Sequence, residues 1–257
     1  MRCSMDGSDT STNKIKRSRP VKVADQIKQW VVERDLKGGD KLPNESKMIE
    51  LFGVSKGTVR EALRILEAQG LIITKTGPGG GSIIGEVSAE RASSLLANYF
   101  YFQDLSLSDI YQMRKALEPE LVASLAGKLS DEQLLELEKL AEMHPNPAEN
   151  PEEEKEQHIS SLRFHARLSE FSGNMLLGFV IGFMSRILTD LTVYRRLYDK
   201  PNYELWKKGR EHQIQLVTAL RVGEAQTAQN IMKSHMQIAE ELMKTQEASL
   251  TKQFMGD

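Results

Sequence analysis

The chain has 257 residues, of which 40% are hydrophobic and 27% are charged, and its formal net charge at pH 7 is −2. This length suits two domains, and the composition is typical of a globular protein and excludes a largely disordered chain. The charge is uneven, because residues 1–86 hold 15 Lys and Arg against 11 Asp and Glu, which leaves 19 against 25 for the remainder. A basic N-terminal part of this kind indicates contact with a polyanion.

The sequence predicts a cytoplasmic protein that makes no contact with a membrane. Its one cysteine, Cys3, cannot form an internal disulfide, which fits a reducing compartment. No apolar run follows Arg2, as a signal peptide would require. The longest apolar stretch, residues 175–184, is shorter than the ~20 residues of a membrane span, so we expect a buried helix there.

The N-terminal part of the chain begins with a polar segment and continues with helical periodicity. Residues 1–19 are polar and aperiodic, and we expect them to form a disordered basic arm. From Val21 the apolar residues recur with helical spacing until Gly38-Gly39. A short second helix is expected after Asn44, a suitable N-cap residue, and it is expected to end at Gly53.

A third helix and a hairpin complete this domain. The helix is expected to start at Ser55, its N-cap residue, and to end at Gly70. Two β-branched runs, residues 71–73 and 82–84, flank a glycine-rich turn and predict a β-hairpin. Three helices followed by a hairpin are the layout of a winged helix-turn-helix, which we assign to residues 20–86.

Residues 87–250 are predicted to form an all-helical, antiparallel bundle, which makes the fold class mainly α. The first long helix is expected from Leu107 to Leu129, with Ile110, Met113, Leu117, Leu121 and Leu125 facing inward. Ser130 and Gln133 form a capping box for the next helix. After a loop marked by Pro145, Pro147 and Pro151, further helices are expected at 153–171, 175–199, 202–222 and 224–248.

The outward face of the third helix carries the candidates for DNA binding. A helix-turn-helix inserts the N-terminal part of its second helix into the major groove, where Arg can read guanine and short polar groups contact phosphates. A merely solvated basic face is the open alternative. The outward residues are Lys56, Gly57, Thr58, Arg60 and Arg64, and Lys75 with the hairpin glycines is placed like a wing beside the minor groove.

The segment from Leu42 to Leu71 resembles the DNA-binding segment of the GntR family of bacterial regulators. The resemblance is carried by Leu42-Pro43, Glu45, Leu51, Gly53-Val54-Ser55, Thr58-Val59-Arg60-Glu61-Ala62-Leu63, Leu66 and Gly70-Leu71. It implies that Ser55, Lys56, Thr58, Arg60 and the wing glycines Gly77 and Gly79 contact DNA. The family usually has Arg where this chain has Ser46, so a phosphate contact there is lost or shared with Lys47.

The helical part resembles the FadR-type (FCD) ligand-binding domain. The resemblance is carried by DIYQMRKALEPELVASLA at 109–126, FHARLSEFSGN at 164–174 and ALRVGEAQTAQNIMKSHM at 219–236. It implies a regulator of the FadR subfamily, a repressor or an activator, in which residues 87–250 bind an effector and form the dimer.

The same resemblance raises a divalent metal (Zn, Ni or Mn) as a cofactor held by His165, His212 and His235, since many FCD domains use an Asp and three His. His165 and His235 lie on inward-facing apolar stripes. Ser161, however, occupies the Asp position, and Gln213 the position of the remaining His; His212 precedes it, about 80° from the inner face at 100° per residue. The alternative left open is that His165 and His235 are core histidines or contact an effector directly.

The expected effector is a small carboxylate bound by Arg114, His165, Gln213 and His235. Arg114 falls in an otherwise apolar helix, and its guanidinium can hold a carboxylate through two hydrogen bonds. An ion pair with Glu118, one turn later, explains Arg114 equally well.

Two other functions compete with a regulator that senses a metabolite. Three histidines around an open metal position could belong to a metal-dependent hydrolase. We expect no enzyme, because no inward carboxylate is predicted beside the histidines as a general base. An architectural DNA-binding protein without ligand is the second alternative. As one recognition helix covers only a half-site, we expect a homodimer on a pseudo-palindromic double-stranded operator.

Overall fold

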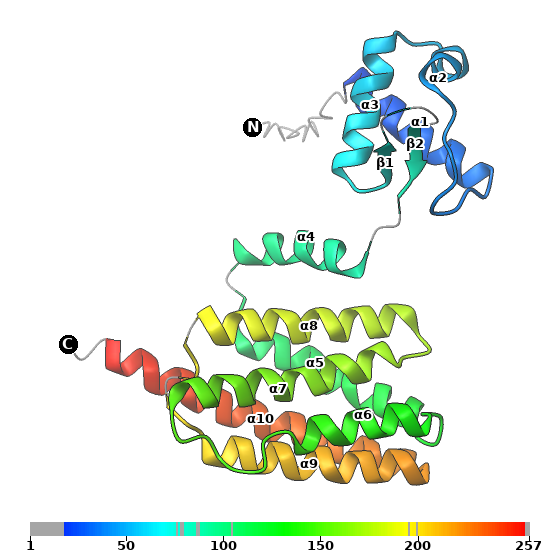
Figure 1. The fold of residues 1–257 in the computed structure, drawn as a ribbon. Coiled ribbons are helices and arrows are strands. Elements are labelled where there is room, and N and C mark those ends of the chain that lie inside the picture. The colour runs from blue at the N-terminus through cyan, green and yellow to red at the C-terminus, as the bar shows by residue number, and fades with distance from the viewer. Residues whose placement is uncertain are drawn as a thin grey trace, which may run out of the picture. The chain divides into compact units, whose positions relative to one another are not determined.

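The computed structural model describes residues 18–75, 77, 80–85, 88–103, 105–194, 196–198 and 200–254. It divides into two compact units, Met1–Ala92 and Ser93–Asp257 (Figure 1). The first holds three helices and a two-stranded antiparallel sheet, and the described part of the second is helical, which confirms the predicted fold class. The predicted arm up to residue 17 and the wing residue Gly79 lie outside the described residues.

The N-terminal unit has the layout that the sequence predicts. Its elements are α1 (Arg19–Glu33), α2 (Glu45–Phe52), α3 (Lys56–Ala68), β1 (Ile72–Lys75) and β2 (Gly81–Ile84). The helices and the sheet share one apolar core, made of Val23, Ala24, Ile27, Leu42, Met48, Val59, Ala62, Leu66 and Ile72.

The two short helices begin at the predicted caps. Asn44 accepts a hydrogen bond from the Lys47 backbone N–H at 2.9 Å, and Ser55 accepts one from the Thr58 N–H at 3.4 Å. These bonds satisfy backbone donors that have no partner within the helix. Gly53 ends α2 with a φ of 60°, a left-handed conformation that glycine adopts without a steric penalty.

The hairpin pairs Ile72 with Ile84 and Lys75 with Gly81. Lys41, ahead of α2, adds an antiparallel bridge to Ile83, an edge that the sequence pattern did not predict. A side chain at Gly80 would place its Cβ 2.3 Å from the Lys75 carbonyl oxygen, so the tight turn requires glycine there.

The C-terminal unit is a helical bundle. Helix α5 packs against α10, α7 packs against α8, and α9 packs against α10 and α6 (Figure 1). One large apolar cluster fills the interior, with Leu121, Phe164 and Leu220 among its fully buried members. The helices are α4 (Ala89–Tyr101), α5 (Leu107–Leu125), α6 (Asp131–Glu142), α7 (Pro151–Glu170), α8 (Met175–Tyr194), α9 (Tyr203–Val222) and α10 (Ala225–Phe254).

Several predicted helix bounds need correction. Helix α5 ends at Leu125 and not at Leu129, because Gly127 takes a φ of 71° and donates its N–H to Leu220 of α9. Helix α7 starts at Pro151, which the sequence placed in a loop, since proline is well suited to the first position of a helix. Helix α8 stops at Tyr194, shortly before Arg196 enters the left-handed region with a φ of 52°.

The inward face of α5 also differs from the prediction. Met113, predicted inward, is 47% exposed, whereas Tyr111, Arg114 and Glu118 are buried. Ile110, Leu121 and Leu125 are buried as predicted, so the buried face of α5 is wider than the predicted apolar stripe. This wider face places two charged side chains inside the bundle.

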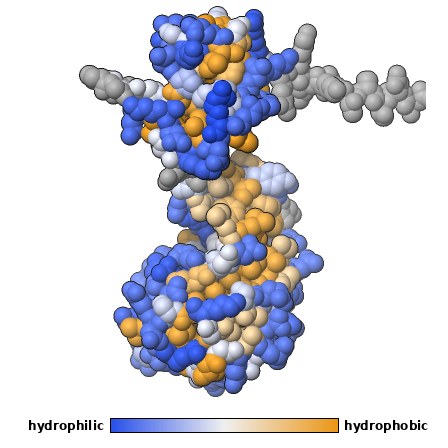
Figure 2. All heavy atoms as spheres, turned by 90° about the vertical axis from the view of Figure 1, so that its right-hand side faces the viewer, coloured by the Kyte–Doolittle hydropathy of each residue, from blue (hydrophilic) through white to orange (hydrophobic). Residues whose placement is uncertain are grey.

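Helix α8 was predicted to be a buried core helix, and it is only partly buried. The segment Met175–Val193 is apolar and long enough to cross a membrane by length and composition alone, and 33% of its most apolar window is buried within the protein. Met175 is 88% exposed and Leu176 is 71% exposed. Figure 2 shows hydrophobic residues gathered on the face of the helical unit that it presents.

Candidate functional site

The basic face of α3 is accessible in the N-terminal unit. Lys56, Gly57, Arg60 and Arg64 are all exposed, while Val59 of the same helix is fully buried. Helix α3 therefore presents the predicted polar residues to solvent and its apolar residues to the core, as a recognition helix must.

Arg60 is held by a neighbour that the sequence analysis assigned no role. Its Nε lies 2.9 Å from Oε1 and 3.1 Å from Oε2 of Glu45, at the first position of α2. A guanidinium that pairs through Nε keeps its terminal nitrogens for another partner. Glu45 can thus orient Arg60 toward a base, and its place in the family motif was the only sequence signal for it.

The other predicted DNA contacts have simpler surroundings. Lys47 is exposed and lies 3.4 Å from Glu50, and Lys75 is exposed at the end of β1. Gly77 has a φ of 100°, which only glycine adopts readily. A surface ion pair such as that of Lys47 is weak enough to be exchanged for a phosphate.

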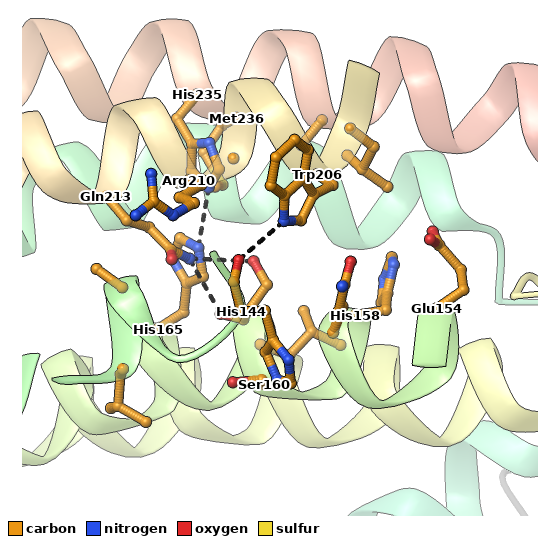
Figure 3. A pocket seen from close by; sticks show the side chains of 18 of the residues that line it. His144, Glu154, His158, Ser160, His165, Trp206, Arg210, Gln213, His235 and Met236 are labelled. Atoms are coloured by element: carbon orange, nitrogen blue, oxygen red, sulfur yellow. Dashed lines mark hydrogen bonds between the residues drawn. The ribbon is translucent and has the colours of Figure 1, made fainter. Parts of the chain in front are cut away.

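The helical unit contains a cavity lined by α5, α6, α7, α9 and α10 (Figure 3). It encloses about 710 Å³ of empty space, including the space at its mouth. The four predicted effector residues, Arg114, His165, Gln213 and His235, all line it. The structure therefore brings together side chains that lie 121 positions apart in the sequence, between residues 114 and 235.

A chain of polar contacts crosses the floor of this cavity. Arg114 Nε lies 2.5 Å from Glu118 Oε1, and Glu118 Oε2 lies 2.6 Å from His165 Nδ1. His165 Nε2 in turn lies 3.0 Å from His235 Nε2. An inward carboxylate therefore does lie beside the histidines, contrary to the prediction, because the buried face of α5 is wider than the predicted stripe.

Charge and burial fix the protonation states in this chain. Burial alone would raise the pKa of Glu118, but Arg114 and then His165 outweigh it and hold that pKa at about 2. Burial lowers the pKa of His165 and, further, that of His235. Because an ionised carboxylate only accepts, His165 donates from Nδ1, and its neutral ring then accepts at Nε2 from His235.

The donors do not fit a metal site of the kind that some FCD domains hold. The hydrogen bond to His235 uses the Nε2 lone pair of His165. The two ring planes are parallel within 3°, and the ring centroids are 5.0 Å apart with the Nε2 atoms facing each other. Because the two Nε2 atoms are 3.0 Å apart, both could reach one cation at about 2.0–2.1 Å, so the misfit lies in the remaining ligands of the set.

No third ligand among the described residues completes such a set. Ser161, at the expected carboxylate position, accepts a hydrogen bond from Gln213 Nε2 at 3.0 Å. His212 lies against the side of the His235 ring, with centroids 5.4 Å apart. Within the described residues, no three His, Cys, Asp or Glu side chains group to hold a metal. The ligand set His165, His212 and His235 stays a prediction that this geometry does not support.

The other half of the cavity holds polar residues that sequence analysis missed. Trp206 donates to the His144 carbonyl oxygen at 3.1 Å, and Glu154 and His158 lie farther along α7 (Figure 3). Burial and then the charge of Arg114 lower the pKa of His158 to about 4, so this imidazole is neutral at pH 7. Helical phase was the available signal, since His158 lies two turns before His165 on the same face.

Fold and sites together define a DNA-binding transcriptional regulator with a helical ligand-binding domain. Residues 21–80 match the family model "Bacterial regulatory proteins, gntR family", and residues 109–238, half of the chain, match "FCD domain". The chain belongs to the GntR family and carries an FCD domain. It is a regulator and not a metal-dependent hydrolase.

Relatives named as repressors cover most of the chain. It is 26% identical to "HTH-type transcriptional repressor NanR" of Enterobacter sp. (strain 638), over 83% of this chain and 81% of that protein. It is 27% identical to the repressor of the same name in a strain of Escherichia coli, over 86% and 85%. The match to the solved structure "Streptococcus agalactiae GntR" covers 86% of this chain and 99% of that chain, with 22% identity and a TM-score of 0.57. This match shows a similar fold.

Proposed function

We propose that this regulator is a repressor whose operator binding is controlled by a small carboxylate held in the cavity by Arg114. The observation that carries the proposal is one atom: Arg114 Nη2 is buried and makes no hydrogen bond of ordinary geometry, on a side chain that is 1% exposed and interacts with Glu118 and the Tyr111 hydroxyl. An unpaired buried donor is costly, and more so on a charged group. A ligand carboxylate is the natural partner of a guanidinium in such a place.

The ion pair with Glu118 does not compete with this role. Glu118 binds Arg114 through Nε and keeps the guanidinium charged and oriented, while Nη2 remains for the ligand. The same carboxylate orients His165, so the floor of the cavity is built before a ligand arrives. We propose His165, Gln213 and His235 as further ligand contacts, with no metal required.

For DNA we propose a division of labour on α3 and the wing. Arg60, held by Glu45, reads base edges, while Lys56 and Lys47 contact phosphates. Ser55, Gly57, Thr58, Arg64, Lys75, Gly77 and Gly79 complete the proposed contact surface.

We further propose that two copies bind a pseudo-palindromic operator, in the cytoplasm where that DNA lies. The exposed apolar residues of the helical unit support a dimer, because a patch of this kind on a protein marks an interaction surface. They include Leu95, Leu96, Tyr99, Met175 and Leu176. Sedimentation should show a dimer at micromolar concentration, and a monomer with and without operator DNA would contradict it.

Mass spectrometry and elemental analysis of the purified protein test the sensing proposal. We expect a bound organic acid and no stoichiometric metal. Stoichiometric Zn, Ni or Mn would contradict metal-independent binding. A protein to which no small acid binds would favour an architectural role.

A further inference from the structure

The C-terminal end of α3 is bound by a side chain from another helix. The last carbonyl groups of a helix lack their regular intrahelical donors, and the last turn of α3 holds no basic residue of its own. Arg91, in the first turn of α4, donates from Nη2 to the carbonyl oxygens of Ala68 at 3.1 Å and of Glu67 at 3.3 Å. A cation at this end of a helix also complements the helix dipole. Arg91 therefore caps α3 from outside.

The surroundings of Arg91 leave room for its guanidinium. Gly70, just after α3, has a φ of 77°, and a Cβ there would lie 2.9 Å from Arg91 Nε and 3.0 Å from its Cζ. Any side chain at Gly70 would thus displace the guanidinium from the end of α3. The carboxylate of Glu67 accepts a hydrogen bond from the Thr74 N–H of β1 at 3.1 Å. The last turn of α3 is therefore joined both to the hairpin and to α4.

Helix α4 begins in the N-terminal unit and ends in the helical unit. The division falls after Ala92, so Arg91 belongs to the first unit and Phe100 to the second. The ring of Phe100 packs against Phe183 of α8, with centroids 5.9 Å apart and planes at 45°. A helix of 13 residues is a stiff rod about 20 Å long. Helix α4 is thus anchored to α3 near its first residue and to α8 near its last.

We infer that Arg91 is a positioning residue for operator recognition: by holding α4 on the end of α3, it makes the protein select the spacing between the two half-sites. This inference rests on the proposed dimer on a pseudo-palindromic operator. Each inserted base pair turns one half-site by about 34° around the DNA axis and moves it by about 3.4 Å. A recognition helix held on a stiff arm cannot follow this movement, whereas one on a loose tether can.

Insertion of base pairs between the half-sites measures this selectivity. A footprint on a fragment of the protein's own promoter locates the centre of the operator, and two or five base pairs are inserted there. Fluorescence anisotropy then gives the affinity of the full-length protein for each DNA. With five inserted base pairs, we expect the native protein to lose about tenfold or more of its affinity, because half a turn of DNA keeps the second half-site from being bound. Arg91→Ala should lose about threefold or less, since its recognition helices can reorient.

Two further variants and a single half-site separate positioning from folding. Arg91→Lys keeps a donor for the two carbonyls and should keep most of the spacing selectivity. Arg34→Ala is the matched control, because it removes the same charge from the N-terminal unit, where Arg34 lies over the Trp30 ring; it should keep the native selectivity. All three variants should bind DNA with one half-site within about twofold of the native protein, as none of them changes the proposed contact surface.

Three results would overturn the inference. They are equal losses of affinity in the native protein and in Arg91→Ala, a native protein that tolerates both insertions, and a large loss of half-site binding in Arg91→Ala, which would confine the role of Arg91 to the DNA-binding unit. A native footprint limited to one half-site would instead overturn the proposed dimer on a pseudo-palindromic operator.

Discussion

Replacement of Arg114 by Lys separates the two roles of this residue. The ammonium group keeps a positive charge beside Glu118, but it lacks the fork that lets one nitrogen bind Glu118 while another binds a ligand. Arg114→Met would be a poorer test, because a buried carboxylate left without its partner costs about 3–5 kcal/mol and the protein could unfold.

The expected magnitude follows from the bond that is lost. A hydrogen bond to a charged group contributes about 1.5–3 kcal/mol, so the affinity for the carboxylate should fall by roughly 10–150-fold. The loss of stability should be smaller, about 1–2 kcal/mol, since the charge beside Glu118 remains. Operator binding without effector should be unchanged, because Arg114 belongs to the helical unit.

Ligand affinity is measured by calorimetry and stability by urea unfolding at pH 7. Arg221→Lys is the matched control, as Arg221 forms an accessible pair with Glu138 on the same unit and should change neither quantity by more than about 0.5 kcal/mol. An Arg114→Lys protein that binds the acid as tightly as the native protein would refute the role of Nη2. Arg114 would then serve only its ion pair with Glu118.

Three further predictions concern DNA, pH and metal. Arg60→Ala should weaken specific operator binding by about 1–3 kcal/mol, whereas Lys56→Ala should weaken binding to all DNA sequences alike and flatten the salt dependence. If neither variant changes the midpoint or the salt dependence of DNA binding in gel-shift assays, α3 is not the recognition helix. The pKa of His158 is lowered from 6.5 to about 4, so below pH 6.5 the unfolded chain binds a proton that the folded protein does not. The free energy of unfolding should therefore fall as the pH is lowered from 6.5 to 4, by about 2 kcal/mol at pH 5. His158→Gln should flatten this slope in urea unfolding, and an unchanged slope would contradict a buried neutral imidazole. Chelator treatment should leave the carboxylate affinity of the native protein unchanged, and loss of binding restored by Zn or Ni would contradict metal-independent recognition.

The N-terminal unit was predictable because its signals are local. Asn44 and Ser55 are caps that act within three residues, and the hairpin follows from two β-branched runs around glycines. Its basic face could be located by helical phase alone. The pairing of Arg60 with Glu45 was not predictable, because it joins residues of two different helices that are 15 positions apart in the sequence.

The helical unit was harder because its site depends on packing between helices. The sequence pattern of α5 is ambiguous, since Leu117 and Met113 compete with Tyr111 for the inner face, and the structure buries Tyr111. The sequence therefore identified Arg114 but offered the ion pair with Glu118 as an alternative to ligand binding. In the structure both residues belong to one chain of contacts.

Helix α4 and half of the cavity were missed for related reasons. Residues 89–101 have an amphipathic pattern at helical spacing that the sequence analysis did not use, and some of their apolar side chains, such as Leu95 and Tyr99, remain exposed. Arg210 lies one turn before Gln213 on α9 and could have been found by phase. That its Nε lacks a partner depends on every neighbouring helix and is visible only in the structure.

Control of operator binding by a small carboxylate is tested most directly by fluorescence anisotropy of a labelled DNA fragment from the protein's own promoter. The protein is titrated with and without the organic acid that mass spectrometry finds bound to it, at a concentration that a shift in melting temperature shows to be saturating. If the effector releases the repressor from DNA, the protein concentration at the midpoint of DNA binding should rise about tenfold or more. This corresponds to a coupling free energy of about 1.4 kcal/mol between the two sites. In Arg114→Lys the midpoint should stay in place at the same concentration of the acid. An unchanged midpoint for the native protein with its cavity occupied would contradict effector control.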